Sequence, residues 1–191
     1  RDHNPSTKTP YVTYVVITIN IAVFAWQELF VTGIPASNQL LIDYAFWPIL
    51  IGESKGNLGL FTHMFLHAGF MHLLGNMLFL WIFGDNMEEK MGHLPFLGFY
   101  ILSGFAAAYL QYLSDTLSAV PMVGASGAIA GVMGGYFLLF PKARVDVFIF
   151  FVIFFRILPI PSFIVLGLWM GLQVFNGLGS DLNSGGTAYW A

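Results

Sequence analysis

The sequence contains no cysteine and has few charged residues. Only 9% of its 191 residues are Asp, Glu, Lys or Arg, whereas 57% are hydrophobic. Without cysteine the chain can form neither disulfides nor thiolate metal sites. Soluble domains carry about 25% charged residues, so the composition excludes an ordinary soluble protein and predicts an integral membrane protein. The seven basic residues form no cluster, so nothing indicates a nucleic-acid partner.

Apolar runs of membrane-spanning character recur along the chain. A helix needs about 20 mostly apolar residues to cross the hydrocarbon core. The sequence predicts five such spans and the beginning of a sixth, within a single domain that covers residues 1–191. The predicted spans are residues 11–30, 72–83, 95–112, 126–140 and 162–178, and the sixth begins at residues 187–191. The predicted fold class is therefore an all-α integral membrane protein, a polytopic helical bundle.

Two connecting segments have a mixed character. Residues 34–71 hold two acidic residues and Lys55 among many Leu, Ile, Phe and Trp residues. This segment is too polar to cross the membrane and too apolar to be fully solvated, so it is predicted to lie in the membrane interface. Residues 142–161 contain an aromatic and β-branched run at 147–155 that is short for a span. They are predicted to form a loop on the cytoplasmic side, either as a strand or as a partly inserted segment.

The basic residues set the expected orientation. With alternating crossings, six of the seven fall on one face of the membrane and only Lys55 falls on the other. By the positive-inside rule that face is cytoplasmic. The N-terminus is therefore expected in the cytoplasm, and the Ser126 end of its span is expected to face outward. The six residues are Arg1, Lys8, Lys90, Lys142, Arg144 and Arg156.

A serine lies among small residues at the start of the fourth predicted span, in Gly124-Ala125-Ser126-Gly127. Small neighbours leave its hydroxyl uncrowded, as a nucleophile requires, although small residues also serve simply to pack membrane helices together. From residue 126 to 140 a helix rises only about 22 Å, against a core of about 30 Å. Ser126 is therefore expected below the outer surface, after irregular backbone at 122–125 that protein or a water-filled cavity must surround.

Further small residues follow Ser126 along the same span. Spacings of four residues place them in two adjacent stripes on the helix surface. Such stripes let helix backbones approach closely, so the glycines are predicted to serve helix packing. One stripe is Gly127, Gly131 and Gly135, and the other is Ser126, Ala130 and Gly134.

His72 and Asn76 lie four residues apart, on one face of the second predicted span. Polar side chains inside a span are costly and are usually functional. Both residues lie near the outer end of the span, at the depth expected for Ser126. Each could donate a hydrogen bond to an oxyanion formed at that serine. The alternative is a pair that only forms hydrogen bonds between helices.

His63 and His67 precede this pair and are also four residues apart. Together with His72 they could supply three zinc ligands, but no glutamate lies between them as in the helix-borne zinc-protease pattern. They are predicted to order the interfacial segment instead. The sequence predicts no metal and no cofactor.

Taken together, three motifs make the chain similar to the rhomboid family of intramembrane serine proteases. They are His63-x-x-x-His67-x-x-x-x-His72-x-x-x-Asn76, Gly84-Asp85-Asn86-Met87-Glu88 and Gly124-Ala125-Ser126-Gly127. The resemblance covers nearly the whole chain. It implies a six-helix core that holds a Ser–His dyad in a water-filled cavity and hydrolyses proteins anchored by a transmembrane segment.

The resemblance also implies roles for individual residues. Ser126 matches the family nucleophile, and His72, Asn76 and the backbone N–H of Ser126 match its oxyanion hole. Glu88 matches a buried acid that ties helices together at the cytoplasmic end. The span at 162–178 matches a helix proposed as a lateral gate for substrate. Supporting positions around the site are predicted at Gly124, Gly127 and His67.

Two positions depart from the family pattern. Ala130 stands one turn after the nucleophile, where some members have a tyrosine, so one ring against which the base could stack is missing. The last helix of the family opens with a small-aromatic run followed by the general-base histidine. Here the run at 188–191 is the end of the sequence. The base is therefore expected immediately after Ala191, and the chain as given is expected to be inactive or nearly so.

Two other functions compete with a protease. A rhomboid-like pseudoprotease would bind membrane proteins without cutting them, but the intact Ser126, His72 and Asn76 argue against it. A channel or transporter would need a polar path, yet only Glu88 and Glu89 add charge at the membrane edge and no inverted repeat is apparent. The predicted partners are transmembrane protein substrates and the lipid bilayer, and the oligomeric state is not indicated. The simple core suggests a prokaryotic plasma membrane by analogy.

Overall fold

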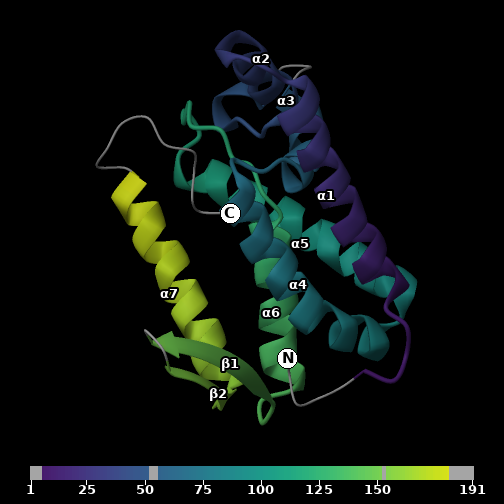
Figure 1. The fold of residues 1–191 in the computed structure, drawn as a ribbon. Helices are drawn as coiled ribbons and strands as arrows, with labels where there is room; N and C mark the ends of the chain where they lie inside the picture. Colours follow the sequence, from purple (N-terminus) through teal and green to yellow (C-terminus); the bar gives the residue numbers. More distant parts are fainter. Residues whose placement is uncertain (1–5, 52–55, 152–153, 181–191) are drawn as a thin grey trace.

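The computed structural model describes residues 6–51, 56–151 and 154–180. Within these residues the chain forms a bundle of α-helices with one β-hairpin and two short 3₁₀ turns (Figure 1). In chain order the elements are α1 (Tyr11–Phe30), α2 (Ile34–Tyr44), η1 (Pro48–Leu50), α3 (Gly56–Thr62), η2 (His63–Phe65), α4 (Phe70–Met91), α5 (His93–Ser114), α6 (Ser126–Leu139), β1 (Arg144–Phe151), β2 (Phe154–Pro161) and α7 (Ser162–Ser180).

Helix α6 runs through the middle of the bundle (Figure 1), where it packs against α4, α5 and α7. It has no charged residue, and a helix that is apolar on all sides is expected in the interior of a fold. Its side chains Ile129, Val132 and Tyr136 are fully buried. The helix that begins with Ser126 is therefore held on several sides by the rest of the chain.

One stripe of glycines brings α5 close to α6. A Cβ atom added at Gly127 would lie 2.4 Å from the Cβ of Ala107, and one added at Gly131 would lie 2.1 Å from the Oγ of Ser103. A Cβ at Gly134, in the adjacent stripe, would meet nothing within 4 Å among the described residues. The packing interpretation is thus confirmed for the stripe that contains Gly127 and Gly131.

Length and composition make this a polytopic helical membrane protein. Helices α1 and α5 are each long and apolar enough to cross a membrane. The stretch Asn57–Phe65, made of α3 and η2, and helix α4 are bent by 81° across a short break and could form one broken span. Helix α6 and the described part of α7 are shorter apolar helices. Large apolar side chains project outward from the bundle, such as Leu102, which is 66% exposed. Two or three of the five predicted spans are therefore supported by length, and the count of five is not.

Helix α1 has the bounds predicted for the first span, whereas α4 extends well beyond the second. The sequence predicts that this span closes before the acidic residues at 85–89, but the helix continues through them to Met91. It can do so because the carboxylates of Glu88 and Glu89 accept hydrogen bonds from the segment that leads into α1 and from its first turn. Helix α4 is therefore longer than the apolar segment, residues 72–83, predicted to cross the membrane.

The two connecting segments have regular structure of their own. Residues 34–71 contain α2, α3 and the two 3₁₀ turns, which lie at one end of the bundle, with the hairpin at the other (Figure 1). In the hairpin β1 pairs with β2 in antiparallel fashion, with Arg144 opposite Pro161. The strand alternative predicted for this region is correct, and the fold is not wholly helical. The sixth span predicted at 187–191 lies outside the described residues.

Candidate active site

Ser126 is the first residue of α6 and is only 1% exposed. Its Oγ has no hydrogen-bond partner among the described residues. The helix also begins without a side-chain cap, so the N–H groups of its first turn are not satisfied by a capping residue. A buried hydroxyl and a helix N-terminus, with its partial positive charge, therefore coincide at one point.

The backbone that leads to Ser126 is irregular but well bonded. Met122 and Phe46 exchange two backbone hydrogen bonds of 2.8 and 3.1 Å, and the N–H of Gly124 donates to the carbonyl of His63 at 2.8 Å. Met122, Val123 and Ala125 are all buried. As predicted, this non-helical stretch is enclosed by protein, which satisfies its backbone groups.

Gly124 brings this segment against the predicted oxyanion residues. A Cβ atom added at Gly124 would lie 2.7 Å from the Cε1 of His72 and 3.5 Å from the Nδ2 of Asn76. Its φ of +122° is also a conformation that other residues rarely adopt. Glycine is required here on both counts. The structure thereby gathers His72 and Asn76 of α4 around the stretch that ends at Ser126.

His67 lies behind this pair, in the loop that precedes α4. Its Nε2 accepts a hydrogen bond of 3.0 Å from the Nδ2 of Asn76, and its ring meets the ring of His72 edge-on, with centroids 5.2 Å apart. Burial, together with the neighbouring His72, lowers the pKa of His67 to about 4. The ring is therefore neutral at physiological pH and can accept this hydrogen bond.

His63 does not join the other histidines in a metal site. Its Nδ1 donates to the carbonyl of Gly59 at 2.9 Å, one helical turn earlier in the connecting segment 34–71. Among the residues that the structure describes, no group of three or more His, Cys, Asp or Glu side chains is placed to hold a metal ion. The contacts of His63 therefore order the segment around α3 and η2.

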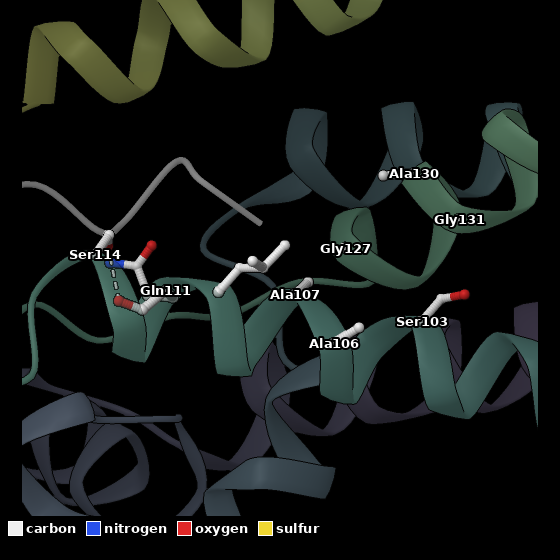
Figure 2. Close-up of a pocket in the computed structure, with 9 residues that line it drawn as sticks. Ser103, Ala106, Ala107, Gln111, Ser114, Gly127, Ala130 and Gly131 are labelled. Carbon is white, nitrogen blue, oxygen red and sulfur yellow. Dashed lines mark hydrogen bonds between the residues drawn. The ribbon is translucent and has the colours of Figure 1, made fainter.

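A cavity of about 420 Å³ lies between α5 and α6, beside the first turns after Ser126. Figure 2 shows Gly127, Ala130 and Gly131 of α6 next to the α5 residues that line it. At its other end is Gln111, a buried residue whose Oε1 has no partner among the described residues. The small side chain of Ala130 thus leaves open space next to the serine-bearing turn.

Glu88 is remote from this cluster. It lies twelve residues after Asn76 on α4, which corresponds to about 18 Å along the helix. Its carboxylate accepts hydrogen bonds of 2.8 Å from the backbone N–H groups of Val12 and Thr13 and one of 2.7 Å from the Thr13 hydroxyl, and it contacts the Nδ1 of His93. It therefore joins the start of α1 to α4 and α5, and takes no part at Ser126.

Gln27 is a contact residue that the sequence does not single out. It lies in the last turn of α1, and its carboxamide forms two hydrogen bonds with the backbone of His67. No motif includes it, because its partner is 40 residues away. The signal that the sequence offers is weak: Gln27 is one of several polar residues in a mainly apolar span.

Comparison with known proteins places these residues in a family context. Residues 55–191 match the family described as Rhomboid domain. The chain is 30% identical over 186 residues to Rhomboid protein 1, mitochondrial, of Saccharomyces cerevisiae, covering 93% of this chain and 48% of that protein. It is 29% identical over 160 residues to RHOMBOID-like protein 5 of Arabidopsis thaliana, with 68% and 52% covered.

A bacterial protein is also similar. YdcA of Bacillus subtilis, named as a candidate rhomboid protease, is 35% identical over 127 residues, which covers 66% of this chain and 63% of YdcA. The chain thus spans about half the length of the curated relatives it matches. Because these relatives include a mitochondrial and a plant protein, they support an integral membrane protein but do not support the predicted prokaryotic plasma membrane.

Proposed function

This chain belongs to the rhomboid family, and from that premise we propose that its parent protein is an intramembrane serine endopeptidase. Its substrates would be proteins anchored by a transmembrane segment, which meet it within the lipid bilayer. The observation that carries the proposal is the buried hydroxyl of Ser126, which has no hydrogen-bond partner within the described part of the chain and lies at an uncapped helix start. A buried polar atom without a partner calls for an explanation, and nucleophilic catalysis supplies one.

Ser126 is the proposed nucleophile. Its Oγ would attack the scissile carbonyl while a neutral histidine takes its proton and later returns it to the leaving amine. We assign this base, by the family resemblance, to a histidine that follows Ala191. His72 is assigned to the oxyanion site and His93 contacts Glu88, so neither of these is free for the role. The space beside Ala130 would leave room for such a group to approach.

The tetrahedral intermediate would be stabilised by three kinds of donor. The backbone N–H of Ser126 lies at the positive end of the α6 dipole. His72 and Asn76 approach the same stretch from α4, as their short distances from a Cβ atom added at Gly124 indicate. Preorganised donors of this kind are worth about 3 kcal/mol each in the transition state.

The orientation belongs to the proposal as well. The N-terminus and the loops at Lys90 and Lys142 would be cytoplasmic, and the segment near Lys55 external. The absence of native cysteine makes accessibility labelling clean. A cysteine introduced at position 142 should react only with a permeant reagent, and labelling from the outside would reverse the orientation.

The direct test of function is cleavage of a membrane-anchored substrate by the full-length protein and by Ser126→Ala. We expect the variant to be inactive, because loss of a catalytic serine costs about 10⁶-fold in related mechanisms. Ser37→Ala is the matched control, since its exposed hydroxyl on α2 donates to the carbonyl of Gly33 in the preceding turn. Cleavage that survives in Ser126→Ala would end the protease proposal, and binding of the substrate without cleavage by either protein would favour a pseudoprotease.

A further inference from the structure

The side chain of Gln27 holds one peptide unit of the loop before α4. Its Nε2 donates to the carbonyl oxygen of His67 at 3.3 Å, and its Oε1 accepts from the N–H of the same residue at 3.4 Å. One carboxamide thus satisfies both backbone groups of a single residue, as a neighbouring strand would. The loop position of His67 is thereby tied to α1.

The same residue contacts the site through its side chain. The His67 ring is 3% exposed, and its Nε2 accepts the hydrogen bond from Asn76 Nδ2 at 3.0 Å. This contact fixes the rotation of the Asn76 amide, and only one N–H of that amide remains for an oxyanion. His67 therefore links α1 to the donor on α4. Gln27 of α1 bonds its backbone, and Asn76 of α4 bonds its ring.

Packing around the loop is incomplete on one side. A cavity of about 270 Å³ adjoins the Gln27 contact and is lined by Leu66, His67, Ala68 and Val123 among others. Leu66 and Val123 are buried in an apolar cluster, but the cavity leaves His67 without close neighbours among the described residues on the side that it occupies. The two hydrogen bonds from Gln27 add a restraint to the His67 peptide at the edge of this space.

We propose that Gln27 is a positioning residue for the reaction, which orients Asn76 through His67. The proposal rests on the proposed function, because it gives Asn76 the oxyanion role. It adds a residue of the first helix to the set that determines the rate. Gln27 touches neither substrate nor reacting atoms, so its effect must pass through Asn76.

The test uses two substitutions in the full-length protein in membranes. Gln27→Met keeps the length of the side chain without hydrogen bonds, and Gln27→Asn keeps the amide but is one methylene too short to reach. Both should lower kcat about tenfold and leave KM unchanged, because small misplacements of catalytic groups have large rate effects. Gln39→Met, which changes an exposed amide of α2, should leave kcat unchanged.

A double-mutant comparison separates positioning from a general structural effect. In an Asn76→Ala background, Gln27→Met should have no further effect on kcat, since the group it orients is gone. An equal loss in both backgrounds, or normal kcat for both Gln27 variants, would overturn the proposal. Should Gln27→Met not fold, Gln27→Asn alone decides between these outcomes. Cleavage that persists in Ser126→Ala would instead mark failure of the proposed function itself.

Discussion

Two polar clusters lie toward opposite ends of α4, and they treat their hydrogen bonds differently. The Ser126 cluster, made of Ser126, His67, His72 and Asn76, leaves the Ser126 Oγ and the His67 Nδ1 without partners among the described residues. The Glu88 cluster, made of Glu88, Val12, Thr13 and His93, satisfies both oxygens of a carboxylate that is 1% exposed.

The difference indicates that the Glu88 cluster serves to join helices, whereas the Ser126 cluster fits the proposed catalytic role. A carboxylate with several donors is a stabilising arrangement, because each buried polar group has its partner. In the Ser126 cluster, by contrast, polar atoms remain without partners among the described residues. Such atoms are available to a substrate or to a charge that forms during the reaction, as the proposed function requires. Substitutions in the Glu88 cluster should therefore change stability, and those in the Ser126 cluster should change turnover.

The largest effect on stability is expected from Glu88→Ala. Removing the carboxylate leaves two N–H groups of α1 and the Thr13 hydroxyl unpaired in a buried place, which should cost about 3–5 kcal/mol. Thermal unfolding in detergent measures the loss. Glu89→Ala is the matched control, because that carboxylate is not buried and accepts its hydrogen bonds from Ser6 and Thr7 in the segment before α1, so its unfolding midpoint should shift little. Equal shifts for the two variants would show that the buried hydrogen bonds of Glu88 add no particular stability.

Asn76→Ala should have the converse effect. We expect kcat to fall by about 10²–10³-fold, equivalent to about 3 kcal/mol of transition-state stabilisation. The unfolding midpoint should shift less than it does in Glu88→Ala. Steady-state cleavage and thermal unfolding on the same preparations make the comparison. If stability falls while the folded fraction turns over normally, Asn76 belongs with the structural residues, and the contrast between the two clusters disappears.

A pair of alanine substitutions in α6 tests the packing that supports Ser126. Gly131→Ala should destabilise the protein by about 1–3 kcal/mol, since its Cβ would collide with Ser103. Gly134→Ala should be neutral or stabilising, because it gains helix propensity in open space. Unfolding midpoints distinguish them, and a Gly134→Ala variant as unstable as Gly131→Ala would contradict the close approach of α5.

The smallest effect is expected at Thr13. Thr13→Val removes a single hydrogen bond to Glu88 and leaves the two backbone donors in place, so the cost should be about 1 kcal/mol. Thr18→Val is the control, because that exposed hydroxyl donates to the Tyr14 carbonyl of its own helix. If Thr13→Val lowered kcat of the folded protein as well as its stability, the two clusters would be linked functionally.

Much of the fold could be predicted where the chain marks its own boundaries. The apolar run between Pro10 and the Gly33–Pro35 stretch gives the bounds of α1, and Ser126 and Pro141 bracket α6. Local composition decides such elements. It does not decide how far α4 continues, because the carboxylates that allow the extension are satisfied by residues of the N-terminal region 75 or more positions earlier.

The candidate site was predictable where it depends on local spacing and composition. Helical spacing places His72 and Asn76 on one face, and the need for small residues points to the segment of Ser126. The hydrogen bond between Asn76 and His67 and the contact of Gln27 with His67 could not be predicted, because each depends on how a loop folds back on a helix. The positive φ of Gly124 likewise appears only in three dimensions.

The central claim is that Ser126 is an activated nucleophile, and labelling tests it most directly. The full-length protein in membranes is treated with a serine-reactive fluorophosphonate, digested, and analysed by mass spectrometry. We expect one adduct, on Ser126, that is absent from Ser126→Ala and weaker in Asn76→Ala. A full-length protein that is folded yet unlabelled at Ser126, or labelled equally at another serine, would contradict it.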